Sequence, residues 1–167
     1  HAYHLVDQTL TARSLPVPAL RSPERGTGWI ARTTHLLATD PGGCWAAEAS
    51  GELVGVVDSF RRELMWLLAS YAVDPSAQGQ GVGRQLLERA LNYGSGCLRG
   101  MFNSSADPKA VRLYRTAGFD LHPTMRAHGV VDRSAVPVDL IARVRDGRPG
   151  DRDLLDSLDR RCRGAAH

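Results

Sequence analysis

The sequence predicts an α/β fold in which helices flank a mixed β-sheet. One observation is the order of the segments, since apolar residues recur at helical spacing in some of them and form strand-like runs in others. That order is two helices, three strands, a helix, a strand, a helix and further strands. The other observation is a glycine-rich turn that joins a long apolar run to an amphipathic one, as happens where a strand leads into a helix. The 167 residues suffice for one domain with a real core.

The first half of the chain predicts two helices followed by a hairpin. A stretch rich in Pro and Gly separates the helices and is expected to be a loop. Ser50-Gly51 separates two strand-like runs and is typical of a hairpin turn. The expected elements are helices at 2–13 and 29–39, a loop at 14–28, strands at 44–49 and 53–60, and a turn at 61–63.

The second half of the chain alternates strands and helices. Residues 64–73 carry bulky apolar side chains on both faces, as expected for a central strand that is covered on both sides. Gly118 follows an amphipathic run that starts at Pro108 and is expected to end a helix. The expected elements are strands at 64–73 and 97–103, helices at 83–93 and 108–117, and last strands at 119–122 and 125–131.

Composition excludes several classes of function. The net charge is +3, and no Lys/Arg block with interleaved aromatic residues occurs, so we expect no nucleic-acid partner. No apolar stretch is long enough to span a membrane and no signal peptide is visible, so we expect no membrane partner. The three cysteines form no Cys-x-x-Cys pair, which favours reduced thiols in a cytoplasmic protein and no metal site.

The segment Val73-Asp-Pro-Ser-Ala-Gln-Gly-Gln-Gly-Val-Gly83 carries the most chemical information. A glycine-rich turn at the start of a helix can direct several backbone N–H groups at one anion, and the helix dipole adds positive potential. A P-loop is excluded because Arg84 and Gln85 follow the last glycine instead of Lys and Ser or Thr. The dinucleotide fingerprint is excluded because the glycines fall at 79, 81 and 83.

What remains, Gln78-x-x-Gly81-x-Gly83 after a strand, resembles the acyl-CoA pyrophosphate loop of the GNAT superfamily of N-acetyltransferases. Residues 107–119 resemble the later motif of that superfamily, Asn-x-x-Ala-x-x-Leu-Tyr-x-x-x-Gly-Phe, with Asp107 at the Asn position. The resemblance covers roughly residues 29–131. It implies the GNAT fold, a central mixed sheet flanked by helices, with acetyl-CoA as co-substrate and an amine of a small molecule or protein as acceptor.

The resemblance also implies which residues hold the cofactor. Backbone N–H groups of the glycine-rich turn would bind the pyrophosphate, although the glycines could also serve only a tight turn, and Arg84 could simply be a surface residue. The end of the preceding strand would bind the pantetheine arm, and an N–H near Ala72 or Val73 would polarise the thioester carbonyl; the alternative is an ordinary paired strand. The implied cofactor-binding residues are Tyr71, Ala72, Val73, Gln78, Gly79, Gln80, Gly81, Val82, Gly83, Arg84, Asp107 and Ala110.

Tyr114 aligns with the tyrosine that often protonates the departing CoA thiolate, and a phenol is protonated at neutral pH. It could instead be a core aromatic residue of its helix. Asp107 precedes Pro108 and is suited to cap the helix, with the cofactor contact as the other reading.

No general base is evident in the expected central strand. The nearby titratable residues are Asp58, Glu63, Asp120 and His122. Deprotonation by ordered water, a substrate that arrives neutral, and a domain without catalysis remain alternatives. Two functions therefore stay open, an acetyl-CoA-dependent N-acetyltransferase and a non-catalytic CoA-binding domain that regulates or stabilises a partner domain.

The C-terminal part sets the expected domain organisation. We expect a GNAT domain at residues 1–135 and an extension at residues 136–167. In the extension, a strand at 140–145 and a helix at 151–163 with Leu154, Leu155 and Leu158 on one face resemble the opening of another GNAT-like domain. The open partners are thus a second GNAT-like domain or a second copy of the chain, and the alternative is a helix that packs on the same domain.

Overall fold

A mixed four-stranded sheet forms the centre of the fold in a computed structural model that describes residues 22–124, 129–130, 132–135, 137 and 144–166. The strands lie in the order β1-β2-β3-β4. The first three pair antiparallel, and β4 pairs parallel with β3, which confirms the predicted mixed α/β sheet. The strands are β1 (Cys44–Ala49), β2 (Glu52–Arg62), β3 (Met65–Val73) and β4 (Arg99–Met101).

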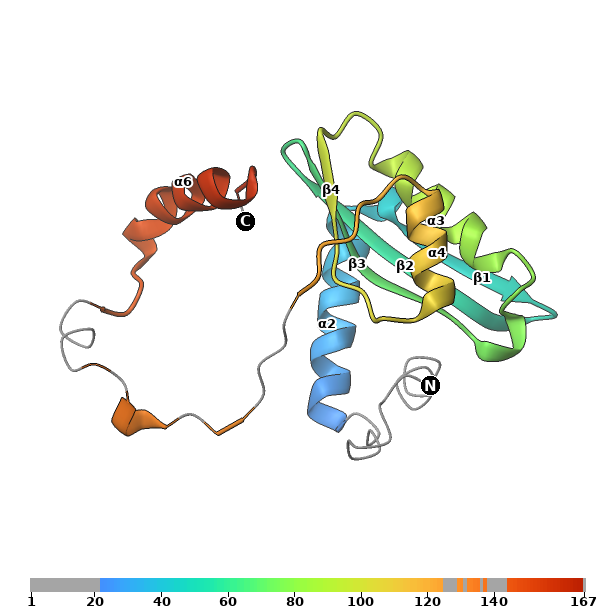
Figure 1. Cartoon of the computed structure of the whole chain (residues 1–167), viewed down its shortest axis with the longest axis horizontal. Coiled ribbons are helices and arrows are strands. Elements are labelled where there is room, and N and C mark those ends of the chain that lie inside the picture. The colour runs from blue at the N-terminus through green and yellow to red at the C-terminus, as the bar shows by residue number, and fades with distance from the viewer. Residues whose placement is uncertain (1–21, 125–128, 131, 136, 138–143, 167) are drawn as a thin grey trace.

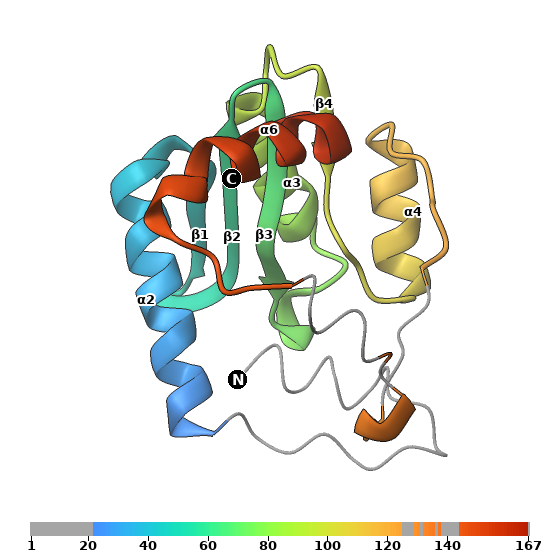
Figure 2. The same ribbon diagram turned by 90° about the vertical axis from the view of Figure 1, so that its left-hand side faces the viewer.

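Helices cover both faces of this sheet (Figures 1 and 2). On one face lie α3 (Val82–Tyr93) and α4 (Pro108–Thr116), and on the other lie α2 (Pro23–Thr39) and α6 (Arg152–Arg163). The core between α3 and the sheet includes Leu86, Leu87 and Ala90, as the helical spacing predicts. Short 3-10 turns complete the described elements: η1 (Pro41–Gly43), η2 (Pro75–Ala77), η3 (Arg133–Ala135) and η4 (Pro149–Asp151).

Helix α2 begins six residues earlier than the sequence analysis predicted. Its start at Pro23 turns the second part of the expected loop into helix. Pro at the first helical position, preceded by Ser22 and followed by Glu24, is a helix start signal. Hydrogen bonding from Ser22 lowers the pKa of Glu24. The helix continues through Gly26 and Gly28 despite their poor helix propensity.

Two hairpins connect the first three strands. The predicted turn at Ser50-Gly51 is present, and both residues have positive φ, as a type I′ hairpin turn requires. The turn predicted at residues 61–63 is wrong, because β2 continues to Arg62, which pairs with Met65. Glu63, at φ 53°, and Leu64 make this turn instead.

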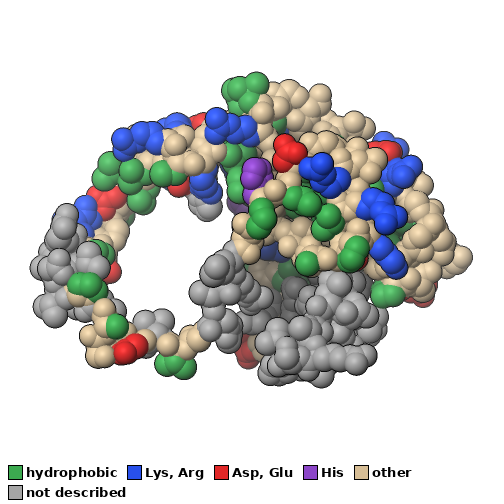
Figure 3. All heavy atoms as spheres, viewed as in Figure 1, with side chains coloured by type: hydrophobic (Ala, Val, Ile, Leu, Met, Phe, Trp, Pro, Cys, Tyr) green, Lys and Arg blue, Asp and Glu red, His purple; other side chains and the backbone are tan. Residues whose placement is uncertain are grey.

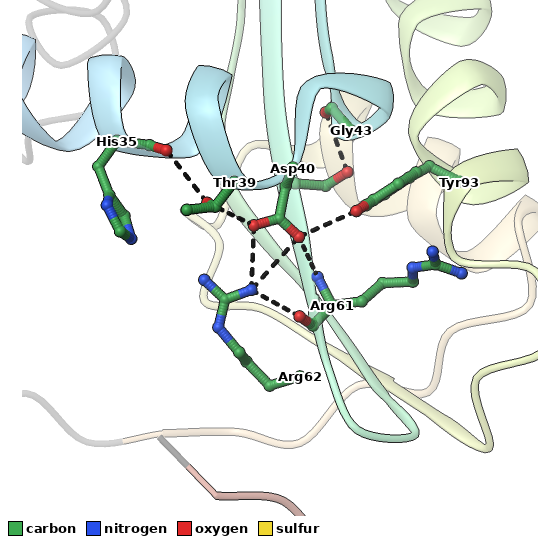
Figure 4. Close-up of polar contacts among 8 residues, drawn as sticks. His35, Thr39, Asp40, Gly43, Arg61, Arg62 and Tyr93 are labelled. Atoms are coloured by element: carbon green, nitrogen blue, oxygen red, sulfur yellow. Dashed lines mark hydrogen bonds and ion pairs between the residues drawn. The ribbon is translucent and has the colours of Figure 1, made fainter.

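A buried carboxylate ties three elements together at the end of α2 (Figure 4). Asp40 is 3% exposed and accepts hydrogen bonds from the Arg61 backbone N–H at 3.0 Å and the Tyr93 hydroxyl at 2.9 Å. Arg62 forms an ion pair with it at 3.0 Å, and Thr39 donates at 2.7 Å. Although burial opposes the charge, these donors lower the pKa of Asp40 to about 2. Asp40 therefore anchors α2 to β2 and α3.

Several predicted elements differ from the structure or lie outside it. Strand β4 is shorter than the predicted 97–103, and residues 119–122 form no strand, because no described strand pairs with them. The predicted helix at 2–13 lies outside the described residues. So do most of the predicted strands at 125–131 and 140–145. None of the helices in the described ranges is long and apolar enough to cross a membrane.

The predicted C-terminal helix is present as α6, and its leucines face solvent. Leu154, Leu155 and Leu158 are 57%, 55% and 40% exposed, and Figure 3 shows hydrophobic side chains at the surface of this helix. Only its end contacts the sheet: Arg160 pairs with Glu63 at 2.7 Å, and Ala165 is buried. Whether this segment belongs to the first domain or to a second one stays a prediction.

Candidate active site

The glycine-rich turn joins β3 to α3 by a backbone path that only glycine adopts readily. Asp74 begins the turn by accepting a hydrogen bond from the Ser76 N–H at 3.0 Å. Gly79 and Gly81 then have φ of 79° and 86°. Gly81 is the N-cap of α3 and lacks a capping side chain, so the first N–H groups of that helix face outward without a side-chain acceptor. This geometry suits an anion.

Gly83 is required for a different reason, because there is no room for a side chain at this position. A Cβ added there would lie 2.5 Å from the Tyr71 hydroxyl oxygen and 3.5 Å from Val73 Cγ2. The first turn of α3 therefore packs directly on the end of β3. The open space around Gly79, by contrast, leaves room for a ligand beside the turn.

The strand before the turn separates from its parallel neighbour. Pairing between β3 and β4 ends at Leu67, opposite Met101, and no described strand lies on that side of residues 68–73. On the other side, the N–H of Asp74 donates to the Val54 carbonyl at 2.8 Å. Because N–H directions alternate along a strand, the N–H groups of Val73 and Tyr71 point toward the gap. Of the two predicted thioester donors, Val73 rather than Ala72 has the required direction.

A cavity of about 240 Å³ lies between the glycine-rich turn, the end of β3 and the start of α4. Eleven of the thirteen predicted site residues line this cavity, although they come from two motifs that are separate in the sequence. They are Tyr71, Ala72, Val73, Gln78, Gly79, Gly81, Gly83, Arg84, Asp107, Ala110 and Tyr114.

Two predicted residues do not line this cavity. The Gln80 side chain donates to the Ser76 carbonyl at 3.0 Å, and Val82 packs against the core, so only their backbone N–H groups could serve a ligand. Conversely, the cavity includes Ser105, Lys109 and Leu113, which the sequence analysis missed. Leu113 could have been found from its helical spacing to Ala110, whereas no local pattern marks Ser105.

A second cavity, also about 240 Å³, occupies the gap beside β3. It is lined by residues 68–72 of β3, residues 102–105 and Tyr114. Tyr71, Ala72, Ser105 and Tyr114 line both cavities. The two cavities therefore meet at the end of β3, so that two reactants could approach one point from different sides.

Two tyrosines stand where the cavities meet. The rings of Tyr71 and Tyr114 lie 6.1 Å apart between centroids, and Tyr114 is 6% exposed. Burial raises the pKa of Tyr71 strongly, and the neighbouring Tyr114 adds to this shift. Tyr71 is therefore protonated at neutral pH, and its hydroxyl has a proton to donate. Tyr114 also packs edge-on against Phe102, so its ring belongs to the core as well as to the cavity.

The charges at the first cavity suit an anionic ligand. Arg84 and Lys109 contribute to the lining, and both are exposed at its rim. Asp107 is the acidic residue of the lining, but its Oδ1 accepts the Lys109 backbone N–H at 2.9 Å. The predicted N-cap is thus present, and the capping bond directs this carboxylate at the helix. The residues present therefore fit the phosphates of CoA.

Three of the four titratable residues considered as bases lie away from this site or are already paired. Glu63 lies in the β2–β3 turn, before the first residue of β3, while the cavities open at the last. Asp120 pairs with Arg115 at 3.2 Å and is exposed, as is His122. Asp58, buried in β2 opposite Ser70, is the remaining one.

Comparison with known families decides the classification. The sequence profile of the acetyltransferase (GNAT) family matches residues 10–119, which is more than half of the chain. The chain belongs to the GNAT family. Its class of reaction is therefore acyl transfer, and the glycine-rich turn and the α4 motif both lie within the matched region. A search of curated proteins gave no match.

One solved structure supports this fold, and two others are similar over part of their length. A candidate acetyltransferase from Pyrococcus horikoshii superposes with a TM-score of 0.56 at 18% identity, over 99% of this chain and 55% of that one. A transcriptional regulator from Bacillus halodurans gives 0.49 at 22% identity, over 62% and 76% of the two chains. Ard1 from Thermoplasma volcanium gives 0.49 at 17% identity, over 72% and 78%.

Proposed function

We propose that this GNAT protein transfers an acetyl group from acetyl-CoA to an amine of a small molecule or protein by direct attack. One observation carries the proposal: the glycine-rich turn, the freed edge of β3 and Tyr114 line two cavities that meet at one point. Direct attack requires both reactants in one site, and holding them there can supply much of the rate.

Each part of the site has a role in this proposal. Backbone N–H groups from Gln78 to Arg84 bind the pyrophosphate, and the edge of β3 pairs with the pantetheine amides. The Val73 N–H donates to the thioester oxygen as it gains charge, and such a donor is typically worth about 10²–10³-fold in rate. Tyr114 donates its phenolic proton to the leaving thiolate. Asp107 caps α4 and thereby fixes the position of Tyr114 and Ala110.

The second candidate is a non-catalytic CoA-binding domain that stabilises a partner. The exposed leucines of α6 favour it, because an apolar stripe in water promotes association. That partner would be a second GNAT-like domain or another copy of this chain.

One assay separates the two candidates. The purified protein is incubated with acetyl-CoA and a panel of amines that includes aminoglycosides, polyamines, amino acids and peptides with free N-termini. Free thiol is measured together with the mass of each amine. An acetylated product with stoichiometric thiol release supports the transferase. Micromolar CoA binding without any acetylated product would support the non-catalytic domain instead.

A further inference from the structure

A buried polar cluster lies between the sheet and α2, on the face opposite α3. Asp58 of β2 and Ser70 of β3 are direct partners in the antiparallel pair, so their side chains stand next to each other on one face. Each residue is only 5% exposed. From α2, Arg32 Nη2 donates to the Ser70 hydroxyl oxygen at 2.9 Å.

The Asp58 carboxylate is only partly satisfied in this cluster. The neighbouring hydroxyls of Ser70 and Thr33 and the charge of Arg32 favour its ionised form. Its second oxygen, Oδ2, is shielded from solvent and has no hydrogen-bond partner among the described residues. Leaving such a group unpaired costs about 1–3 kcal/mol. Burial outweighs the favourable contacts and raises the pKa of Asp58.

Ser70 connects this carboxylate to the second cavity. It lines that cavity beside Tyr71 and Ala72, which also line the cofactor cavity. A hydroxyl has one proton to donate and two lone pairs that accept. Ser70 accepts from Arg32, and its hydroxyl proton is available to Asp58, its register partner, so one lone pair is left for a donor in the cavity.

We propose that Asp58 is the proton acceptor for the attacking amine and that Ser70 relays the proton. This inference rests on the proposed function, since it needs an amine in the second cavity. An ammonium proton moves to Ser70 Oγ while the Ser70 hydroxyl proton moves to an Asp58 oxygen. The electron pair of the broken N–H bond stays on nitrogen and forms the new N–C bond. The second proton that nitrogen loses, when the C–S bond breaks and the amide forms, replaces the one that Tyr114 gives to the thiolate. Asp58 releases its proton to solvent after turnover, and Arg32 holds Ser70 in place.

The groups that face Asp58 come from α2 and from the neighbouring strand β1. From α2 come the guanidinium of Arg32 and the buried hydroxyl of Thr33, both of which favour the ionised form of Asp58. From β1 comes Cys44, the register partner of Asp58. Burial and the charge of Asp58 raise the pKa of Cys44, so this thiol stays neutral at pH 7.

The test uses Asp58→Asn and Ser70→Ala in the whole chain, with Glu48→Gln as the control, because Glu48 is an exposed carboxylate on the neighbouring strand β1. Single-turnover acetylation of the best amine of the panel is followed from pH 5 to 9, beside a CoA titration. Both cluster variants should be about 10²–10⁴-fold slower at neutral pH. Their deficit should shrink as pH rises, because the amine then loses its proton unaided. CoA affinity and the Glu48→Gln profile should match wild type.

A purely structural role predicts a different result. In that case the variants are less stable, and any deficit is independent of pH, which would overturn the inference. If Asp58→Asn fails to fold, Ser70→Ala still tests the relay. Carboxyl-carbon NMR of the wild-type protein adds an independent readout. An Asp58 that titrates at or below an ordinary Asp overturns the relay even if acetylation is observed, whereas a lack of turnover with intact CoA binding overturns the proposed function together with it.

Discussion

Replacing Gly83 by Ala tests the close packing of α3 on the end of β3. The added Cβ would lie 2.5 Å from the Tyr71 hydroxyl oxygen, which is closer than real Cβ contacts come. Tyr71 is partly buried between Gly83 and Tyr114, so the hydroxyl has to move within a packed site. Overpacking of this kind costs about 1–3 kcal/mol. For a chain of this size the melting temperature should fall by roughly 2–12 °C.

The double variant Tyr71→Phe/Gly83→Ala shows whether the hydroxyl is the cause. Without the Tyr71 hydroxyl oxygen, the next contacts of the added Cβ are Val73 Cγ2 at 3.5 Å and Tyr71 Cζ at 3.6 Å, which are ordinary van der Waals distances. Tyr71→Phe should therefore recover most of the lost stability, with a coupling of about 1–3 kcal/mol in a double-mutant cycle read by urea unfolding. Additive effects of the two changes would refute this packing argument.

Three further predictions concern the acid, the anchor and the tail. Tyr114→Phe should slow single-turnover acetyl transfer by about 10²–10⁴-fold at unchanged CoA affinity, and an undiminished rate would assign Tyr114 to packing alone. Asp40→Ala should lower the free energy of unfolding by roughly 3 kcal/mol, because it leaves charged and hydroxyl donors unpaired. The folded pKa of Asp40 is about 2, below the ordinary 3.8, so wild type should keep this stability above pH 3.8 and lose it as pH falls through about 2. The free energy of unfolding is measured for both proteins over that pH range. If the variant loses as much stability as wild type, Asp40 does not have this role. Deleting residues 143–167 should leave CoA binding intact and lower the melting temperature by only a few degrees, because this segment meets the rest of the fold mainly at its end, through the exposed Arg160–Glu63 ion pair and residues 163–166. Unfolding of the shortened chain would make the tail part of the domain.

Local chemistry made much of this fold predictable. The turn at Ser50-Gly51 requires positive φ, and the spacing of Leu86, Leu87 and Ala90 marks the buried face of α3. The start of α2 was missed because its glycines indicated a loop, while the Ser-Pro-Glu start signal was the stronger effect. The missing strand at 119–122 has another cause, since a strand depends on a partner that the local sequence does not specify.

In the candidate site, too, local signals could be predicted from the sequence and long-range contacts could not. The glycines and the α4 motif are local signals, and they predicted most of the residues that line the first cavity. The opposition of Asp58 and Ser70 depends on the register of two strands, and the contact with Arg32 depends on how α2 crosses the sheet. Such long-range pairings leave no pattern in a single sequence, and so the base was left open.

The most direct test of the central claim is a calorimetric titration of CoA into wild type, Gly81→Glu and Gly96→Glu. Gly81 and Gly96 have nearly the same positive φ, 86° and 88°, so either substitution should cost about 1–2 kcal/mol of stability. Gly81 lines the first cavity, whereas Gly96 lies in the turn after α3. We predict micromolar binding to wild type and to Gly96→Glu, and none to Gly81→Glu. Binding that survives in Gly81→Glu with wild-type affinity would contradict the claim that this turn holds the cofactor.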